Sequence, residues 1–138
     1  MSDLLDTSML VRYLTGDPPD LATVSAGVID GEEELLVTDV VLAETAYVLT
    51  SVYRVPRDLV VDHLIALLRK ANIDTFRLDK DVVLEALLLC RPSGRVSFAD
   101  ALVWAAARSE AGTRVYSFDE RFPDDGITVL RSAGDERS

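Results

Sequence analysis

The chain has 138 residues, of which 49% are hydrophobic and 28% are charged. This length suits one globular domain, and the composition excludes a disordered or low-complexity chain. The formal net charge of −10 opposes broad, sequence-blind attraction to nucleic acid phosphates. A nucleic acid substrate stays open, since acidic enzymes cut nucleic acids when metal ions neutralise clustered carboxylates.

Three features of the sequence bear on whether the protein is expected in a membrane, outside the cell or in the cytoplasm. The longest uncharged runs, 21–29 and 45–53, have nine residues each, whereas a membrane span needs roughly 18 apolar residues. The first six residues contain two acids, Asp3 and Asp6, where a secretory signal carries positive charge. Cys90 is the only cysteine and cannot form an internal disulfide. We therefore expect a soluble cytoplasmic protein without a membrane partner.

Apolar runs and helical spacing predict alternating strands and helices along the chain. Strands are expected at 3–5, 35–38, 73–78, 114–118 and 127–130, and helices at 7–15, 21–29, 40–53, 56–70, 81–90 and 97–111. Strands that are separated by helices predict an α/β fold, a parallel sheet with helices on both faces. Residues 1–131 are expected to form a single domain and residues 132–138 a flexible tail.

Acidic residues follow several of these strands, at the edge where α/β proteins place their sites. An Asp at such a junction is also a good helix cap, because its carboxylate accepts hydrogen bonds from free backbone N–H groups. Capping suffices to explain Asp79, and Asp39 is ambiguous. Asp6 and Asp119 differ because each follows an apolar strand, so they are candidates for a functional site.

Two more acids interrupt helices that otherwise appear apolar on most sides. Glu44 is the only charge between Asp39 and Arg54, and Asp100 is the only charge between Arg95 and Arg108. An exposed stripe would explain Glu44, and a capping box beginning at Ser97 would explain Asp100. Neither acid has a Lys or Arg three or four residues away, so a shared cation is the other explanation.

The candidate site therefore consists of four carboxylates: Asp6, Glu44, Asp100 and Asp119. Carboxylate oxygens without an imidazole cluster favour Mg²⁺ or Mn²⁺ over zinc. His63, the only histidine, lies among leucines in the middle of a predicted helix and is an improbable catalyst. The chain has no glycine-rich nucleotide-binding motif and no nucleophile elbow.

With these residues the sequence resembles the PIN-domain ribonucleases, and within them the VapC-type toxins of toxin-antitoxin pairs. The resemblance runs from end to end and rests on four short motifs: Leu5-Asp6-Thr7-Ser8, Leu42-Ala43-Glu44, Phe98-Ala99-Asp100-Ala101-Leu102 and Tyr116-Ser117-Phe118-Asp119. It implies a three-layer α/β sandwich, with a central parallel sheet of four or five strands flanked by helices.

The resemblance also implies the chemistry of the site. Asp6, Glu44, Asp100 and Asp119 would bind Mg²⁺, which Mn²⁺ can replace, and would act as the catalytic set. Thr7 and Ser117 would support Asp6 and Asp119 from behind. Three arginines near the site in sequence could contact phosphates, although solvated surface is the simpler explanation for each: Arg12, Arg95 and Arg121.

The implied activity is metal-dependent endoribonuclease cleavage of tRNA or ribosomal RNA that inhibits translation. The implied partners are the RNA substrate, a small antitoxin protein and a second copy of the chain in a homodimer. One alternative is a PIN-fold interaction module without catalysis. Another is a receiver-like phosphoacceptor domain, but such a domain needs a Lys after the last strand, and the chain has none after Lys80.

Overall fold

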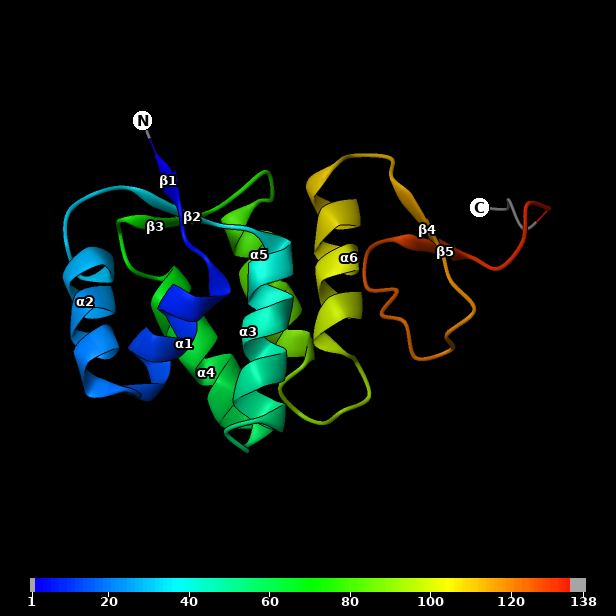
Figure 1. Cartoon of the computed structure of the whole chain (residues 1–138). Coiled ribbons are helices and arrows are strands. Elements are labelled where there is room, and N and C mark those ends of the chain that lie inside the picture. The colour runs from blue at the N-terminus through cyan, green and yellow to red at the C-terminus, as the bar shows by residue number, and fades with distance from the viewer. Residues whose placement is uncertain (1, 135–138) are drawn as a thin grey trace.

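The structure is a computed structural model that describes residues 2–134, and this part of the chain contains short strands and longer helices in alternation (Figure 1). The strands are β1 (Asp3–Leu4), β2 (Leu35–Val37), β3 (Ile73–Thr75), β4 (Arg114–Tyr116) and β5 (Thr128–Leu130). The helices are α1 (Thr7–Thr15), α2 (Pro19–Ile29), α3 (Asp39–Ser51), α4 (Arg57–Leu68), α5 (Lys80–Leu89) and α6 (Phe98–Ser109). The expected α/β fold with parallel strands is confirmed.

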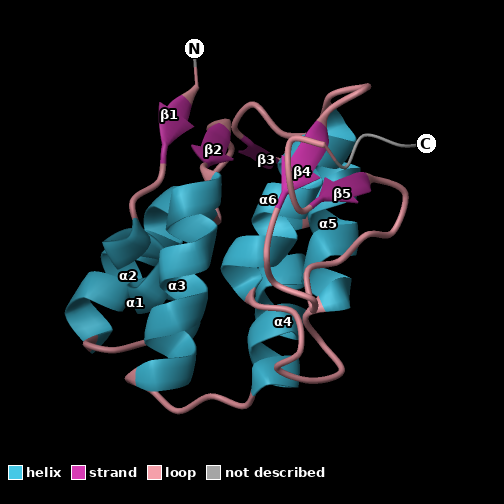
Figure 2. Ribbon diagram, turned by 90° about the vertical axis from the view of Figure 1, so that its right-hand side faces the viewer, coloured by secondary structure: helices cyan, strands magenta, loops and turns pink. Residues whose placement is uncertain are grey.

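Three parallel strands form the main sheet in the order β1-β2-β3. Leu35 of the central strand pairs with Asp3 on one side and with Ile73 on the other. Leu35 and Ile73 are almost completely buried, as expected for strands whose side chains pack against helices. Figures 1 and 2 show the strands along the top of the molecule, with the helices below them.

The sheet differs in size from the expected four or five strands. β4 and β5 pair with each other in parallel, with Val115 opposite Val129, and form a separate two-stranded sheet. Figures 1 and 2 show this pair on the far side of α6 from β1. One physical reason is the length of β1, because two residues present few backbone groups at the free edge for a further strand.

The helices begin and end close to the expected residues, and local hydrogen bonds explain why. Asp6 precedes α1 and accepts a hydrogen bond from the backbone N–H of Ser8, while Gly16 ends that helix with a positive φ of 72°. The hydroxyl of Thr38 accepts from the backbone N–H of Val41 at the start of α3. Asp79 caps α5, as its position predicts.

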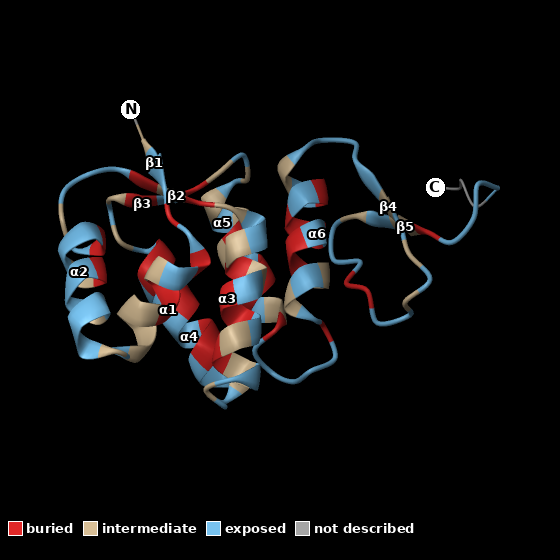
Figure 3. Cartoon of the chain, in the orientation of Figure 1, coloured by how far each residue is buried: buried red, intermediate tan, exposed pale blue. Residues whose placement is uncertain are grey.

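The buried side chains come mainly from the helix faces that turn towards one another and from the central strands (Figure 3). Trp104 of α6 is 2% exposed, and its indole N–H donates to the backbone oxygen of Asp125 at 2.9 Å. This bond fastens the loop before β5 to α6. Cys90 lies in the core, where burial raises the pKa of its thiol to about 11, so it is a packing residue, not a nucleophile.

Within residues 2–134, every helix is too short to cross a lipid bilayer. The predicted flexible tail, residues 132–138, lies in part outside the described residues. His63 is exposed on α4, although it was expected among leucines, because its helix turns this position away from the core.

Candidate active site

The four predicted acids lie at the starts of helices or directly after strands. Asp6 lies between β1 and α1, Glu44 in the second turn of α3, and Asp100 in the first turn of α6. Asp119 lies three residues beyond β4. Asp6 and Glu44 are exposed, whereas Asp100 and Asp119 are half-buried. The apolar surroundings expected for Glu44 are absent, because α3 turns this position to solvent.

Thr7 connects the first two acids. Its side chain is largely buried at the start of α1, and its hydroxyl donates a hydrogen bond to Oε1 of Glu44 at 2.5 Å. Thr7 follows Asp6 directly, so this bond holds the Glu44 carboxylate beside the N-terminus of α1. The sequence predicted that Thr7 would support Asp6, but in the structure its hydroxyl holds Glu44.

Asp6 is held as an ionised group by its neighbour. The hydroxyl of Ser8 donates to Oδ2 of Asp6 at 2.9 Å, and the backbone N–H of Ser8 donates at 3.4 Å. These hydrogen bonds keep the pKa of Asp6 below its ordinary value of 3.8. Asp6 therefore carries its negative charge throughout the neutral range.

Asp100 belongs to the first turn of α6, next to a groove between α3 and α6. The hydroxyl of Ser97 accepts from the backbone N–H of Asp100 at 3.0 Å, which is one half of the expected capping box. The groove has a volume of about 160 Å³, and Ala43 of α3 and Ala99 of α6 both line it. Since Glu44 follows Ala43 and Asp100 follows Ala99, the two acids lie on the two helices that form this groove.

Asp119 is held by its own loop. The backbone N–H of Arg121 donates to Oδ1 of Asp119 at 2.8 Å, and the Arg121 side chain lies 3.4 Å away. These contacts lower the pKa of Asp119. The backbone N–H of Asp119 donates to the hydroxyl of Ser117 at 3.1 Å. Arg121, a candidate for phosphate contact, is thus engaged with Asp119.

The structure brings together some of the predicted residues and not others. Thr7 joins the Asp6 turn to Glu44, and Asp100 lies on the helix across the groove. β4 and β5 lie on the other side of α6 from β1 (Figure 1), and Asp119 belongs to the loop that joins these two strands. Within residues 2–134, the structure gathers no group of three or more potential metal ligands among His, Cys, Asp and Glu.

The donor chemistry of Asp6 and Glu44 nevertheless fits Mg²⁺. This ion keeps several waters and usually binds through one or two carboxylates together with substrate phosphates, so it does not need a closed protein cage. Asp6 is ionised and exposed, and Glu44 is exposed and held near it by Thr7. These two carboxylates would hold the ion.

Two residues near the groove were not predicted as site residues from the sequence: Arg57 was not considered, and Asp39 was ambiguous between a helix cap and a functional acid. Asp39, the first residue of α3, lines the groove with Val40. Arg57 of α4 reaches the loop before α6 and donates to the backbone oxygens of Ser93 and Val96. Backbone acceptors leave no pattern in the sequence, so no signal could have identified Arg57.

Comparison with known protein families gives a match over most of the chain. The family model described as PIN domain matches residues 4–125 of the chain. No curated protein matches the chain.

Proposed function

The chain belongs to the PIN domain family, and from this premise we propose that it is a Mg²⁺-dependent endoribonuclease and the VapC-type toxin of a toxin-antitoxin pair. PIN domains are in general nucleases, so the chemistry is hydrolysis of phosphodiester bonds. The proposed substrates are tRNA or ribosomal RNA, whose cleavage would stop translation. A cognate antitoxin, a homodimeric state and a cytoplasmic location complete the proposal.

The observation that carries this proposal is the extent of the family match. Residues 4–125 include all four predicted acids, and they also include Thr7 and Ser117. The hydrogen bond from Thr7 to Glu44 supports the proposal further, because it orients a carboxylate beside Asp6. A hydrogen bond that orients a ligand is a typical companion of a metal site.

The proposed roles follow from the charge and position of each residue. A bound divalent ion would lower the pKa of a water molecule and neutralise charge on the scissile phosphate. Asp6 and Glu44 would hold that ion, and Thr7 would keep Glu44 in place. Asp100 would orient the attacking water. Asp119 would bind a second ion or help to orient that water. Cleavage by an activated water leaves a 5′-phosphate and a 3′-hydroxyl.

The test is cleavage of total RNA by the purified chain, free of antitoxin, with Mg²⁺, Mn²⁺ or EDTA. We expect discrete fragments with 5′-phosphate ends in the presence of metal and none with EDTA. Asp100→Asn and Glu44→Gln should abolish cleavage. Asp81→Asn is the matched control, because Asp81 is an exposed acid on α5. This variant should cleave RNA as the unmodified chain does. Full activity of Asp100→Asn would contradict the proposed roles.

A second candidate is a PIN-fold interaction module without catalysis. Within residues 2–134 no three potential metal ligands among His, Cys, Asp and Glu lie together, and this favours the second candidate. Calorimetric titration with Mn²⁺ distinguishes the two: the nuclease should bind the ion and lose binding in Glu44→Gln, whereas a pure interaction module should show no binding heat.

A further inference from the structure

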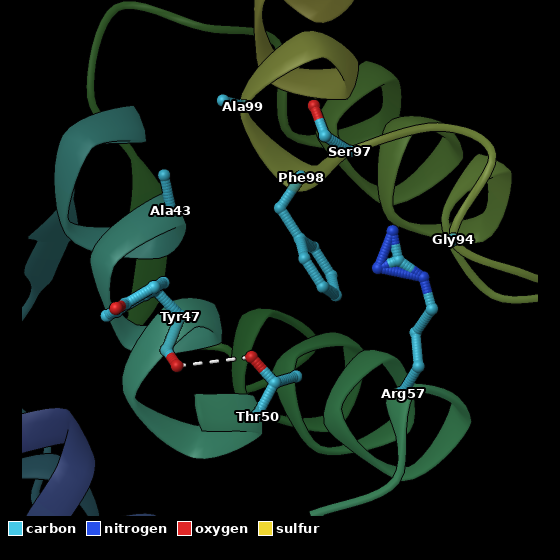
Figure 4. A pocket seen from close by; sticks show the side chains of 8 residues that line it. All are labelled: Ala43, Tyr47, Thr50, Arg57, Gly94, Ser97, Phe98 and Ala99. Carbon is cyan, nitrogen blue, oxygen red and sulfur yellow. Dashed lines mark hydrogen bonds between the residues drawn. The ribbon is translucent and has the colours of Figure 1, made fainter. Parts of the chain in front are cut away.

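A second cavity lies beside the candidate active site, at the other end of the groove between α3 and α6. It has a volume of about 350 Å³. Ala43, Tyr47 and Thr50 of α3 line one wall, and Phe98 and Arg57 line the opposite side. Figure 4 shows the ring of Phe98 pointing into the space between α3 and Arg57.

The wall opposite α3 combines an aromatic ring with a fixed positive charge. The Arg57 guanidinium lies over the Phe98 ring, 4.6 Å from its centroid. The same guanidinium donates to the backbone oxygen of Ser93 at 2.8 Å and to that of Val96 at 2.5 Å. Arg57 forms no ion pair within the part of the chain that the structure describes, so its charge stays available to an anionic ligand.

The cavity is continuous with the candidate active site. Ala43 and Ala99 line both the cavity and the smaller groove, and they directly precede Glu44 and Asp100. The cavity therefore lies next to the helical turns that carry these two acids, on the path open to a nucleic acid chain bound there.

From these observations we propose that the cavity binds the unpaired base of an RNA nucleotide next to the scissile phosphate. This inference rests on the proposed nuclease function and names its substrate more closely: single-stranded RNA with a preferred base at one position. The cavity of about 350 Å³ has room for a base beside the Phe98 ring, and stacking on such a ring is strongest for a purine. The charge of Arg57 complements the phosphate attached to that base. The exposed Tyr47 offers a second aromatic face at the mouth of the cavity.

The test measures base preference directly. The chain cuts a pool of single-stranded RNA oligonucleotides with randomised central positions in Mn²⁺, and sequencing of the product ends gives base frequencies around each cut. We expect purines, which stack more strongly than pyrimidines, to be enriched up to about tenfold at one position beside the cut. Phe98→Leu should reduce this enrichment severalfold and slow the cleavage of the purine-containing sequences.

Two further variants keep the test decisive. Tyr47→Ala removes an exposed side chain that lines the cavity, so it should fold normally and also weaken the preference. Leu88→Ala removes an exposed apolar side chain on α5 that lies outside the cavity, and it should keep the full preference. Circular dichroism melting curves check that each variant is folded.

The outcomes separate the two proposals. Metal-dependent cleavage without base preference, or with a preference that survives both Phe98→Leu and Tyr47→Ala, would overturn the base site alone and assign the cavity to another occupant. Cleavage of total RNA but of none of these oligonucleotides would overturn the base site alone. Failure of the unmodified chain to cut either total RNA or the oligonucleotides would overturn the proposed function and the base site with it.

Discussion

At the scale of single residues, two buried threonines differ in whether their hydroxyls form a hydrogen bond. Thr45 of α3 is fully buried, and its hydroxyl has no hydrogen-bond partner within residues 2–134. Thr75 of β3 is 6% exposed, and its hydroxyl donates to the backbone oxygen of Leu78 at 2.7 Å. An unpaired buried hydroxyl costs free energy, whereas a paired one contributes to stability.

Replacing each threonine with valine should therefore change the free energy of unfolding in opposite directions. Thr45→Val keeps the shape of the side chain and removes the unpaired hydroxyl, so it should raise the free energy of unfolding by about 1 kcal/mol. Thr75→Val should lower it by about 1 kcal/mol, because the oxygen of Leu78 loses its donor. Urea unfolding followed by circular dichroism measures both. A destabilised Thr45→Val would show that its hydroxyl has a partner in solution.

A second residue prediction concerns Thr7, whose hydroxyl donates to Glu44, so that its proposed role is to position this carboxylate. Thr7→Val removes the hydrogen bond to Glu44 and should lower RNA cleavage by about tenfold, as is common when an orienting bond to a ligand is lost. Thr7→Ser keeps the hydroxyl and should restore activity. The Mn²⁺ affinity of the two variants should follow the same order, whereas a purely structural role of Thr7 would leave that affinity unchanged.

At the scale of elements, the caps explain where the helices begin. Oδ1 of Asp79 accepts hydrogen bonds from the backbone N–H groups of Asp81 and Val82, at 2.9 and 3.4 Å. Asp79→Ala should therefore lower the free energy of unfolding by about 1 kcal/mol.

Asp79→Asn is the control for this cap, because an Asn oxygen accepts the same bonds without charge and should lower stability by only a few tenths of that amount. Thermal or urea unfolding compares the two variants. Equal losses in both would show that the charge of Asp79 matters more than the hydrogen bonds, through attraction to the positive end of the helix.

The elements themselves could largely be predicted from the sequence, because caps and apolar spacing are local. Gly16, Asp79 and Ser97 mark helix ends by their own chemistry, and the structure has helices ending or starting beside each of them. The division of the strands into two sheets could not be predicted, since it depends on which edges meet after the helices have packed. No local pattern distinguishes a strand that pairs with β1 from one that pairs with β5.

In the candidate site, too, contacts between residues far apart in the sequence could not be predicted. Asp6 stands out in the sequence because it follows an apolar strand, and Glu44 because no Lys or Arg lies three or four residues away. In the structure Thr7, which follows Asp6, bonds to Glu44. The partner of Thr7 could not be predicted, because it lies 37 residues away along the chain. Arg57 was missed because its acceptors are backbone oxygens of a loop 36 to 39 residues away.

At the scale of the whole molecule, acidic residues dominate the charge, with 24 acids against 14 basic residues. Four carboxylates at the surface, three exposed and Asp119 half-buried, have a lowered pKa: Asp6 through Ser8, Asp30 through Lys70, Asp62 through Arg91 and Asp119 through the backbone of Arg121. In each case a hydrogen bond present only in the folded chain favours the ionised form.

This arrangement predicts the direction of the pH dependence. A carboxylate with a lowered folded pKa binds its proton more readily in the unfolded chain, whose ordinary value is 3.8. The stability that it contributes is complete above that value and is lost as the pH falls through the folded pKa. The midpoint of urea unfolding should therefore decrease as the pH is lowered below 3.8.

Asp62→Asn removes one such group, the one that Arg91 contacts at 2.8 and 2.9 Å, and should make this decrease shallower. Glu85→Gln is the matched control, because Glu85 is exposed and makes no hydrogen bond within residues 2–134, so its acid profile should follow the unmodified chain. The same slope in Asp62→Asn and the unmodified chain would show that solvent screens the Asp62–Arg91 pair too strongly for it to stabilise the fold.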